Sequence, residues 1–223
     1  MSFFELLERE TTAERLALYA VPQILDGLAG QISRETYVAY LAEAYHHVRH
    51  TVPLLTRARD GMDAAHARFR TAMEDYIAEE TGHEHWILND IRNAGGDAES
   101  VRLGPPGAAT ERMVSYAYDY VSRVNPMGMF GMIYVLEGTS IALATHGAEA
   151  LSSSLGLGPE CFSYLSSHGS LDQEHMKFFA GLMATVEDPA DRAAIVHVAK
   201  QVFGLFADVF RSIPHQGRLA HAV

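Results

Sequence analysis

The feature of this sequence that most constrains its fold is the helical spacing of its apolar residues. They recur every three or four positions over long stretches, and the strict alternation of a half-buried strand is absent. Stretches rich in glycine and proline interrupt this pattern. Because long helices with short connections pack as an antiparallel bundle, we expect an all-α fold. The uninterrupted segments predict helices near residues 12–29, 34–59, 62–93, 108–123, 126–153, 160–184 and 189–212.

The size of the chain fits one domain. Its 223 residues can enclose a full hydrophobic core, and 48% apolar with 20% charged residues is an ordinary balance for a globular protein. We expect a single helical-bundle domain over residues 1–214 and a disordered tail over residues 215–223.

Charge and cysteine usage restrict the partners and the compartment. A net charge of −11 disfavours binding to nucleic acid or to an anionic membrane surface. Cys161 is the one cysteine, so neither a disulfide framework nor a thiolate-rich metal site can form, which fits a reducing compartment. The first residues lack the basic and apolar regions of a secretion signal. We therefore expect a cytoplasmic protein that binds neither nucleic acid nor membrane.

Residues 126–145 form the most apolar segment, and Glu137 is its one charged residue. The segment is near the length of a membrane span, about 20 residues. A charge at its centre would be costly in lipid, so we expect a buried core helix instead. A buried carboxylate is paired, protonated or bound to a metal. The sequence leaves open whether Glu137 is a metal ligand or the partner of an arginine.

Glu80 and His83 lie three positions apart on the third predicted helix, so one face carries both side chains. They could bind one ion together, because Glu-x-x-His is the spacing that carboxylate-bridged di-iron bundles use. The alternative is a solvated face, since Glu79, Glu84 and His85 crowd the same region.

His168, Asp172 and His175 follow one another at spacings of four and three, which places them on one stripe of a helix. Two imidazoles and a carboxylate suit a borderline metal such as iron. In the alternative, Ser170 caps a helix with Gln173 completing a capping box, and His168 then lies on the preceding turn.

An earlier helix carries secondary candidates. Glu43, His47 and His50 share one face, and they could add a ligand or line the pocket together with Tyr76. The alternative is that these histidines are partly exposed or hydrogen-bonded elsewhere.

These motifs in this order resemble the heme-oxygenase-like diiron oxidases, which are related in fold to the TenA and PqqC proteins. The segment 45–55 (YHHVRHTVPLL) is also similar to the early helix of that wider superfamily. The resemblance implies a seven-helix bundle of the heme-oxygenase-like, TenA-like type and two non-heme irons, with manganese as an alternative metal. Some members have a further carboxylate where this chain has Tyr76, so either Glu79 or Glu80 must serve or one iron is held weakly. The implied metal ligands are Glu80, His83, Glu137, His168, Asp172 and His175.

The same resemblance implies an oxidoreductase. We expect an oxidase or oxygenase that uses O2 at a non-heme diiron centre to oxidise, hydroxylate or oxidatively cleave a small organic metabolite, and we expect a homodimer. The apolar helix 126–141 leaves room for an apolar substrate.

Other functions on the same fold are open to the sequence. A TenA-type thiaminase needs a cysteine nucleophile, and Cys161 occupies no matched position. A cofactorless oxidase of the PqqC type would find Glu137 and Asp172 poor pocket lining. The acidic balance of the chain disfavours heme propionates. A non-catalytic helical interaction protein also fits, because a fold does not set a function.

Overall fold

Regular structure in the part of the chain that the computed structural model describes is entirely helical, which confirms the all-α prediction. The description covers residues 1–215, except the side chains of residues 168–174. Three short 3-10 helices are η1 (Ala64–His66), η2 (Pro126–Gly128) and η3 (Pro159–Cys161). The α-helices are α1 (Phe3–Glu10), α2 (Thr12–Tyr19), α3 (Pro22–Leu28), α4 (Arg34–Val48), α5 (Thr51–Gly61), α6 (Ala67–Glu80), α7 (His83–Asn93), α8 (Ala98–Leu103), α9 (Ala108–Arg123), α10 (Met129–Leu155), α11 (Ser163–Met183) and α12 (Pro189–Ser212).

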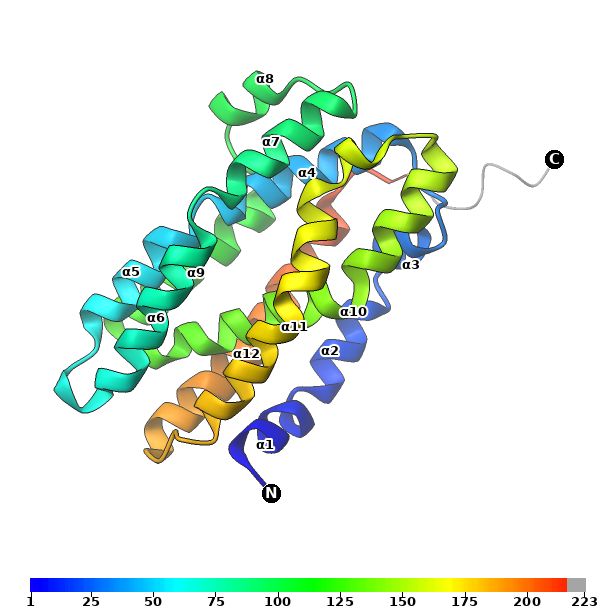
Figure 1. Ribbon diagram of the computed structural model, residues 1–223. Helices are drawn as coiled ribbons and strands as arrows, with labels where there is room; N and C mark the ends of the chain where they lie inside the picture. The colour runs from blue at the N-terminus through cyan, green and yellow to red at the C-terminus, as the bar shows by residue number, and fades with distance from the viewer. Residues whose placement is uncertain (216–223) are drawn as a thin grey trace.

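Helix α10 is the centre of the bundle, and its most extensive contacts are with α11 and α12 (Figure 1). Helices α5, α6 and α9 form the other side, and α4 packs along α7. The larger core cluster joins Phe130, Phe179 and Phe203 from α10, α11 and α12, each at most 2% exposed. Burying one such side chain contributes about 1.5–3 kcal/mol, so this three-helix contact is a main source of stability.

Gly131 allows α10 and α12 to approach closely. A Cβ atom at this position would overlap the carbonyl oxygen of Ile195 and would lie 2.8 Å from the backbone nitrogen of Ala199. Both of those atoms belong to the α12 backbone and cannot move aside cheaply. The glycine is therefore required by the crossing of the two helices.

Several predicted helices are wrong because they are divided in the structure. Segment 12–29 breaks before Pro22, since a residue that precedes proline is pushed out of helical geometry, and Val21 is extended. Segment 34–59 breaks at positions 49–50, because in a continuous helix the ring of Pro53 would clash with the carbonyl of Arg49 four residues earlier. Segment 62–93 breaks at Gly82, which has a left-handed φ of 96°. Helices α1 and α8 were not predicted at all.

Helices α10 and α12 are long and apolar enough to cross a membrane by length and composition. However, 67% of the apolar window in Pro126–Leu155 and 50% of that in Pro189–Ser212 is buried inside the bundle. Burial of this kind is what we expected of a core helix around Glu137.

A cluster of polar contacts around His66 ties distant segments together. The His66 imidazole lies 2.8 Å from Asp63 through Nδ1 and 2.9 Å from Asp191 of α12 through Nε2, and Asn125 donates to Asp191 at 2.9 Å. Burial alone would lower the pKa of His66, but the hydrogen bonds to Asp191 and Asp63 outweigh it and raise that pKa. We call these four residues the His66 clamp.

Residues 213–215 follow α12 and contact α3 and α4, and we call them the C-terminal strap. The Thr36 hydroxyl donates to the carbonyl of Pro214 at 3.0 Å, and His215 Nε2 lies 2.8 Å from Asp26 Oδ2. His215, which we placed in the tail, is therefore held by the domain. The rest of the predicted tail, residues 216–223, lies outside the described residues.

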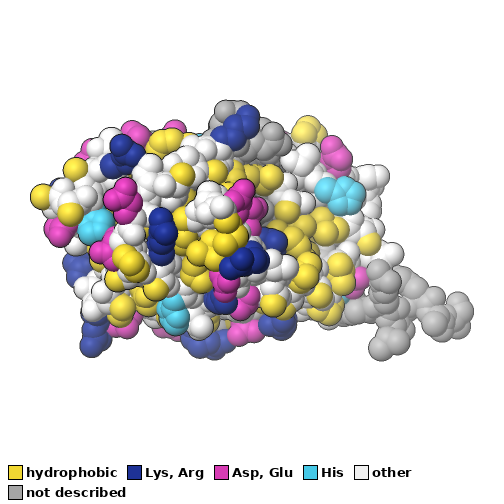
Figure 2. Space-filling view, turned by 90° about the horizontal axis from the view of Figure 1, so that it is seen from below, with side chains coloured by type: hydrophobic (Ala, Val, Ile, Leu, Met, Phe, Trp, Pro, Cys, Tyr) yellow, Lys and Arg dark blue, Asp and Glu magenta, His cyan; other side chains and the backbone are white. Residues whose placement is uncertain are grey.

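On the face of the molecule seen in Figure 2, charged side chains of both signs surround and interrupt the apolar ones. Large exposed apolar side chains belong to separate segments, such as Leu25 of α3, Leu103 of α8 and Phe178 of α11. Apolar residues scattered in this way are ordinary on a protein surface.

Candidate metal centre

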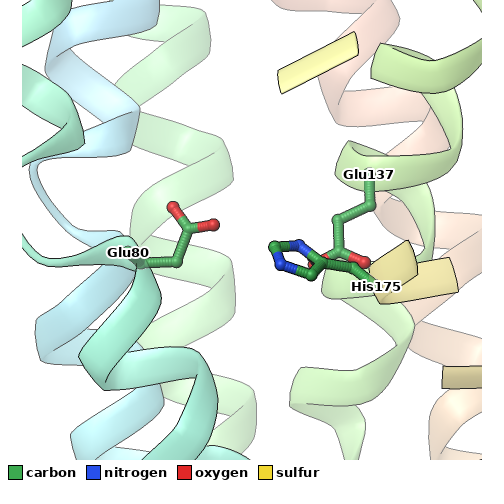
Figure 3. A group of neighbouring side chains, drawn as sticks. All are labelled: Glu80, Glu137 and His175. Carbon is green, nitrogen blue, oxygen red and sulfur yellow. Dashed lines mark ion pairs between the residues drawn. The ribbon is translucent and has the colours of Figure 1, made fainter. Parts of the chain in front are cut away.

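Glu80, Glu137 and His175 converge from three helices on one space inside the bundle (Figure 3). Each offers one ligand atom, and these atoms all lie within 4.8 Å of one another. Glu80 and Glu137 are 9% and 8% exposed, and His175 is partly buried. Ligand atoms lie about 2 Å from a bound ion, so two ligands of one ion are at most about 4 Å apart. Small side-chain rotations would therefore let the three residues share an ion.

The end of α6 and the start of α7 place Glu80 next to His83. The prediction put both on one continuous helix, but the left-handed Gly82 separates them into the last turn of α6 and the first turn of α7. His83 Nδ1 nevertheless lies 3.0 Å from Glu80 Oε2, and its ring stacks on Trp86 with centroids 4.0 Å apart. His83 thus holds the Glu80 carboxylate in place, and its role as a direct ligand stays a prediction.

His175 lies between two carboxylates. Its Nδ1 is 3.8 Å from Glu137 Oε1, and its Nε2 is 3.0 Å from Glu79 Oε2. The Glu79 side chain is 52% exposed, whereas that of Glu137 is 9% exposed. The imidazole therefore has one nitrogen toward solvent and one toward the buried centre, which fixes the ring orientation that a ligand needs.

The two other residues of the His-x3-Asp-x2-His motif are His168 and Asp172, and their side chains lie outside the described residues. The backbone of α11 is helical from Ser163, so the alternative helix start at Ser170 is wrong. Positions 168, 172 and 175 share one stripe of that helix, as the spacing predicted.

Asp90 explains why α11 begins at Ser163. This fully buried carboxylate accepts the backbone N–H groups of Ser163 and Tyr164 at 3.0 and 2.8 Å, and it also accepts the Ser163 hydroxyl. Burial raises the pKa of Asp90, although these hydrogen bonds oppose the shift. Asp90 therefore anchors the helix that carries His175.

Of the secondary candidates, Glu43 and His50 have other partners. Glu43 accepts the backbone N–H of Gly107 at 3.1 Å and the hydroxyl of Thr110, so it caps the start of α9. His50 Nδ1 lies 3.2 Å from the Tyr118 hydroxyl, and burial lowers the pKa of His50. Among the described residues, the group whose ligand atoms converge does not include Glu43 or His50. Their placement therefore gives no support to a role for either residue as an extra ligand.

The remaining two candidates are buried aromatic neighbours. The His47 ring packs edge-on against Phe206 with centroids 5.7 Å apart. The Tyr76 ring packs edge-on against His175 with centroids 6.1 Å apart. Of the two roles that the sequence allowed for Tyr76, ligand or pocket lining, its position beside His175 agrees with pocket lining.

A cavity of about 70 Å³ adjoins the centre, and we call it the carboxylate cavity. Glu80, Glu137 and Tyr76 line it together with apolar side chains, among them Met132 and Ile133. The sequence analysis missed several wall residues, among them Ser140 and Tyr164. Ser140 could have been found, because it falls three positions after Glu137 and so shares its face of α10. No comparable signal marks Tyr164.

The chemistry of these side chains fits iron. Carboxylate oxygen and imidazole nitrogen are donors that iron and manganese accept, and thiolates are not part of the group. Two carboxylates buried close together also need a cation or protons nearby. The residues present therefore fit a metal of this class.

Comparisons with known proteins identify the family. The family described as iron-containing redox enzyme matches residues 38–206, and the chain belongs to it. Its fold is that of the heme-oxygenase-like and TenA proteins, as the sequence resemblance indicated. No curated protein sequence matches the chain.

Solved structures show how widely this fold is shared. A domain of unknown function with a heme oxygenase-like fold from Shewanella denitrificans is 23% identical, with a TM-score of 0.85 over 96% of this chain and 92% of that one. A TenA homologue from Pseudomonas syringae is 10% identical, with a TM-score of 0.78 over 94% and 91%. A heme oxygenase from Leptospira interrogans is 15% identical, with a TM-score of 0.74 over 94% and 98%. At these identities the likeness shows the fold alone.

Proposed function

We propose that this protein is an O2-dependent oxidase or oxygenase with a non-heme iron centre, two irons when fully loaded, that acts on a small organic metabolite. The observation that carries the proposal is the convergence of Glu80, Glu137 and His175 inside a member of an iron-containing redox enzyme family. His83, His168 and Asp172 complete the proposed ligand set from the sequence. Bound iron would supply the electrons and coordination positions that O2 chemistry requires.

The side chains around the centre have distinct tasks in this proposal. Glu80 and Glu137 offset the charge of the metal, and His83 orients the Glu80 carboxylate through the 3.0 Å hydrogen bond. Glu79 orients His175 from the solvent side. The apolar wall of the carboxylate cavity limits the access of water to the centre, which protects reactive species from side reactions.

Rival chemistries fit these residues less well. The carboxylate cavity, at about 70 Å³, is lined by two buried carboxylates, which would repel the propionates of a heme. For a thiaminase, Cys161 would have to be a nucleophile, yet it is 1% exposed and burial raises its pKa. A raised pKa reduces the thiolate that a nucleophile requires.

Metal analysis tests the proposal. The purified protein is loaded anaerobically with Fe(II), desalted and analysed for metal, and we expect about two irons per chain. Glu74→Gln, an exposed carboxylate on the same helix as Glu80, is the matched control and should bind as the wild type does. Protein that takes up no Fe(II), or that binds heme with a Soret band instead, would overturn the non-heme assignment.

A further inference from the structure

A second and larger cavity, of about 130 Å³, lies between α3, α4, α10, α11 and α12. Among the described residues its lining contains no Asp, Glu, Lys, Arg or His. Most of the wall is aliphatic or aromatic, for example Leu28, Leu143 and Phe206. We call it the apolar cavity. A space with such a wall favours an uncharged hydrocarbon group and disfavours charged ones.

The apolar cavity adjoins the carboxylate cavity. Leu136, Ser140 and Tyr164 line both, so these three side chains form the partition between them. Leu136 directly precedes Glu137 on α10, and Ser140 lies one turn further on. A molecule that reaches past this partition would therefore have one end beside the carboxylates and the other in an apolar chamber.

The C-terminal strap forms another part of the wall of the apolar cavity, through Ile213. Thr36 and Gln23 also line the cavity. Thr36 donates a hydrogen bond to the backbone carbonyl of Pro214 in the strap at 3.0 Å, and Gln23 donates one to that of Arg211 at the end of α12 at 3.1 Å. These two polar side chains are thus engaged by backbone carbonyls, and the volume of the cavity limits how much of a ligand can be buried in it.

We propose that the apolar cavity holds a hydrocarbon tail of the substrate, whose reacting end lies in the carboxylate cavity. This assignment of substrate class rests on the proposed function. The Ser140 hydroxyl is buried at the junction and makes no hydrogen bond to the described residues, so it is available to a polar group of the substrate there. Since an apolar cavity of about 150 Å³ holds a benzene ring, a volume of about 130 Å³ corresponds to a buried tail of about five or six carbons.

Binding of straight-chain alcohols to metal-free protein tests the tail cavity without depending on iron. The series runs from methanol to 1-decanol, and binding is measured by calorimetry and by the rise in melting temperature. Burial of each added methylene should tighten binding about fourfold. The gain should stop once the chain reaches about five or six carbons, because further methylenes are no longer buried in the cavity.

Gly147→Leu is the decisive variant. Gly147 lies on the cavity wall in α10, and a Cβ atom there would make an ordinary 3.8 Å contact with Leu28, so the rest of the leucine must extend into the cavity. We expect the optimal alcohol to shorten by about four carbons, the number that the leucine side chain adds. Gly27→Leu fills the same cavity from α3, where an added Cβ meets nothing within 4 Å, and provides the test if the first variant does not fold.

Gly204→Leu is the matched control, because it makes the same change on the exposed face of α12 with nothing within 4 Å of an added Cβ. It should keep the wild-type length profile. A wild-type affinity that does not depend on chain length, or an unchanged optimum in both cavity variants, would overturn the proposal. If iron uptake fails while the length profile holds, the metal assignment is wrong and the tail cavity stands. If iron is bound and affinity does not depend on alcohol length, the tail cavity is wrong and the metal assignment stands.

Discussion

Replacing Glu137 by glutamine separates a metal ligand from a partner in a structural ion pair. The change keeps the size of the side chain and removes its charge. In metal-free protein Glu137 attracts a protonated His175 at 3.8 Å and repels Glu80, whose ligand atom lies within 4.8 Å. At an effective dielectric constant of about 20, each interaction is about 4 kcal/mol and the two have opposite signs. We therefore expect the free energy of unfolding of the metal-free variant to lie within about 1 kcal/mol of wild type.

The effect of Fe(II) should be much larger. A ligand that binds only the folded protein at 1,000 times its Kd stabilises it by about 4.1 kcal/mol. Loss of a residue that only hydrogen-bonds to a metal ligand weakens metal binding about 10–100-fold, so loss of a ligand itself should weaken it at least about 100-fold. A roughly 100-fold weaker affinity removes about 2.7 kcal/mol of that stabilisation. Since 1 kcal/mol shifts the Tm of a domain of this size by about 2–4 °C, the iron-induced rise in Tm should be smaller by about 5–11 °C.

Thermal melts of both proteins under nitrogen, with and without Fe(II), provide the measurement, with Glu74→Gln as the control. If Glu137 were instead paired with a buried arginine, the metal-free variant would lose on the order of 3 kcal/mol, because the arginine would be left uncompensated. A loss of that size together with an unchanged iron-dependent shift would refute the reasoning and remove Glu137 from the ligand set.

Three further predictions concern the centre, the helix crossing and the His66 clamp. Glu80→Ala and His175→Ala should each lose iron by metal analysis while circular dichroism stays that of the wild type; wild-type iron content would exclude these residues as ligands. Gly131→Ala should lower the free energy of unfolding by about 1–3 kcal/mol in urea, because its Cβ overlaps the α12 backbone, and Gly204→Ala should not. Because the folded protein raises the pKa of His66, protonated His66 stabilises the fold below the unfolded pKa of about 6.5, and this stabilisation is lost as pH rises through the folded pKa. The free energies of unfolding in urea at about pH 6 and about pH 8.5 should therefore differ more for wild type than for His66→Ala. Equal pH dependence of the two proteins would contradict that last prediction.

The bundle could be predicted from the sequence because helical spacing of apolar residues reports burial directly. The helix ends were harder, since the apolar pattern continues across the breaks at Gly82 and before Pro53, and backbone geometry rather than burial ends the helices there. Helices α1 and α8 have eight and six residues, too few for a period to be visible.

The sequence indicated the individual residues of the candidate centre but not their arrangement in space. Glu80, Glu137 and His175 were each indicated by their helix face or by an unusual charge in an apolar segment. Their convergence depends on how α6, α10 and α11 pack, which periodicity does not determine. The interaction between His83 and Glu80 likewise depends on the left-handed turn at Gly82, which the Glu-x-x-His spacing concealed.

Helix α10 carries both Glu137 and a wall of the apolar cavity that extends to Leu151, and this makes the chain sensitive to changes of length within that segment. Each inserted or deleted residue turns the following part of an α-helix by about 100° and moves it by about 1.5 Å along the axis. One insertion between Glu137 and Gly147 would therefore turn the cavity wall away from the carboxylate. Insertions in the connecting loops would leave the two in register. If the tail cavity is used as proposed, we therefore expect a change in the length of the tail to require an exchange of small and large side chains along this helix, and not a longer helix.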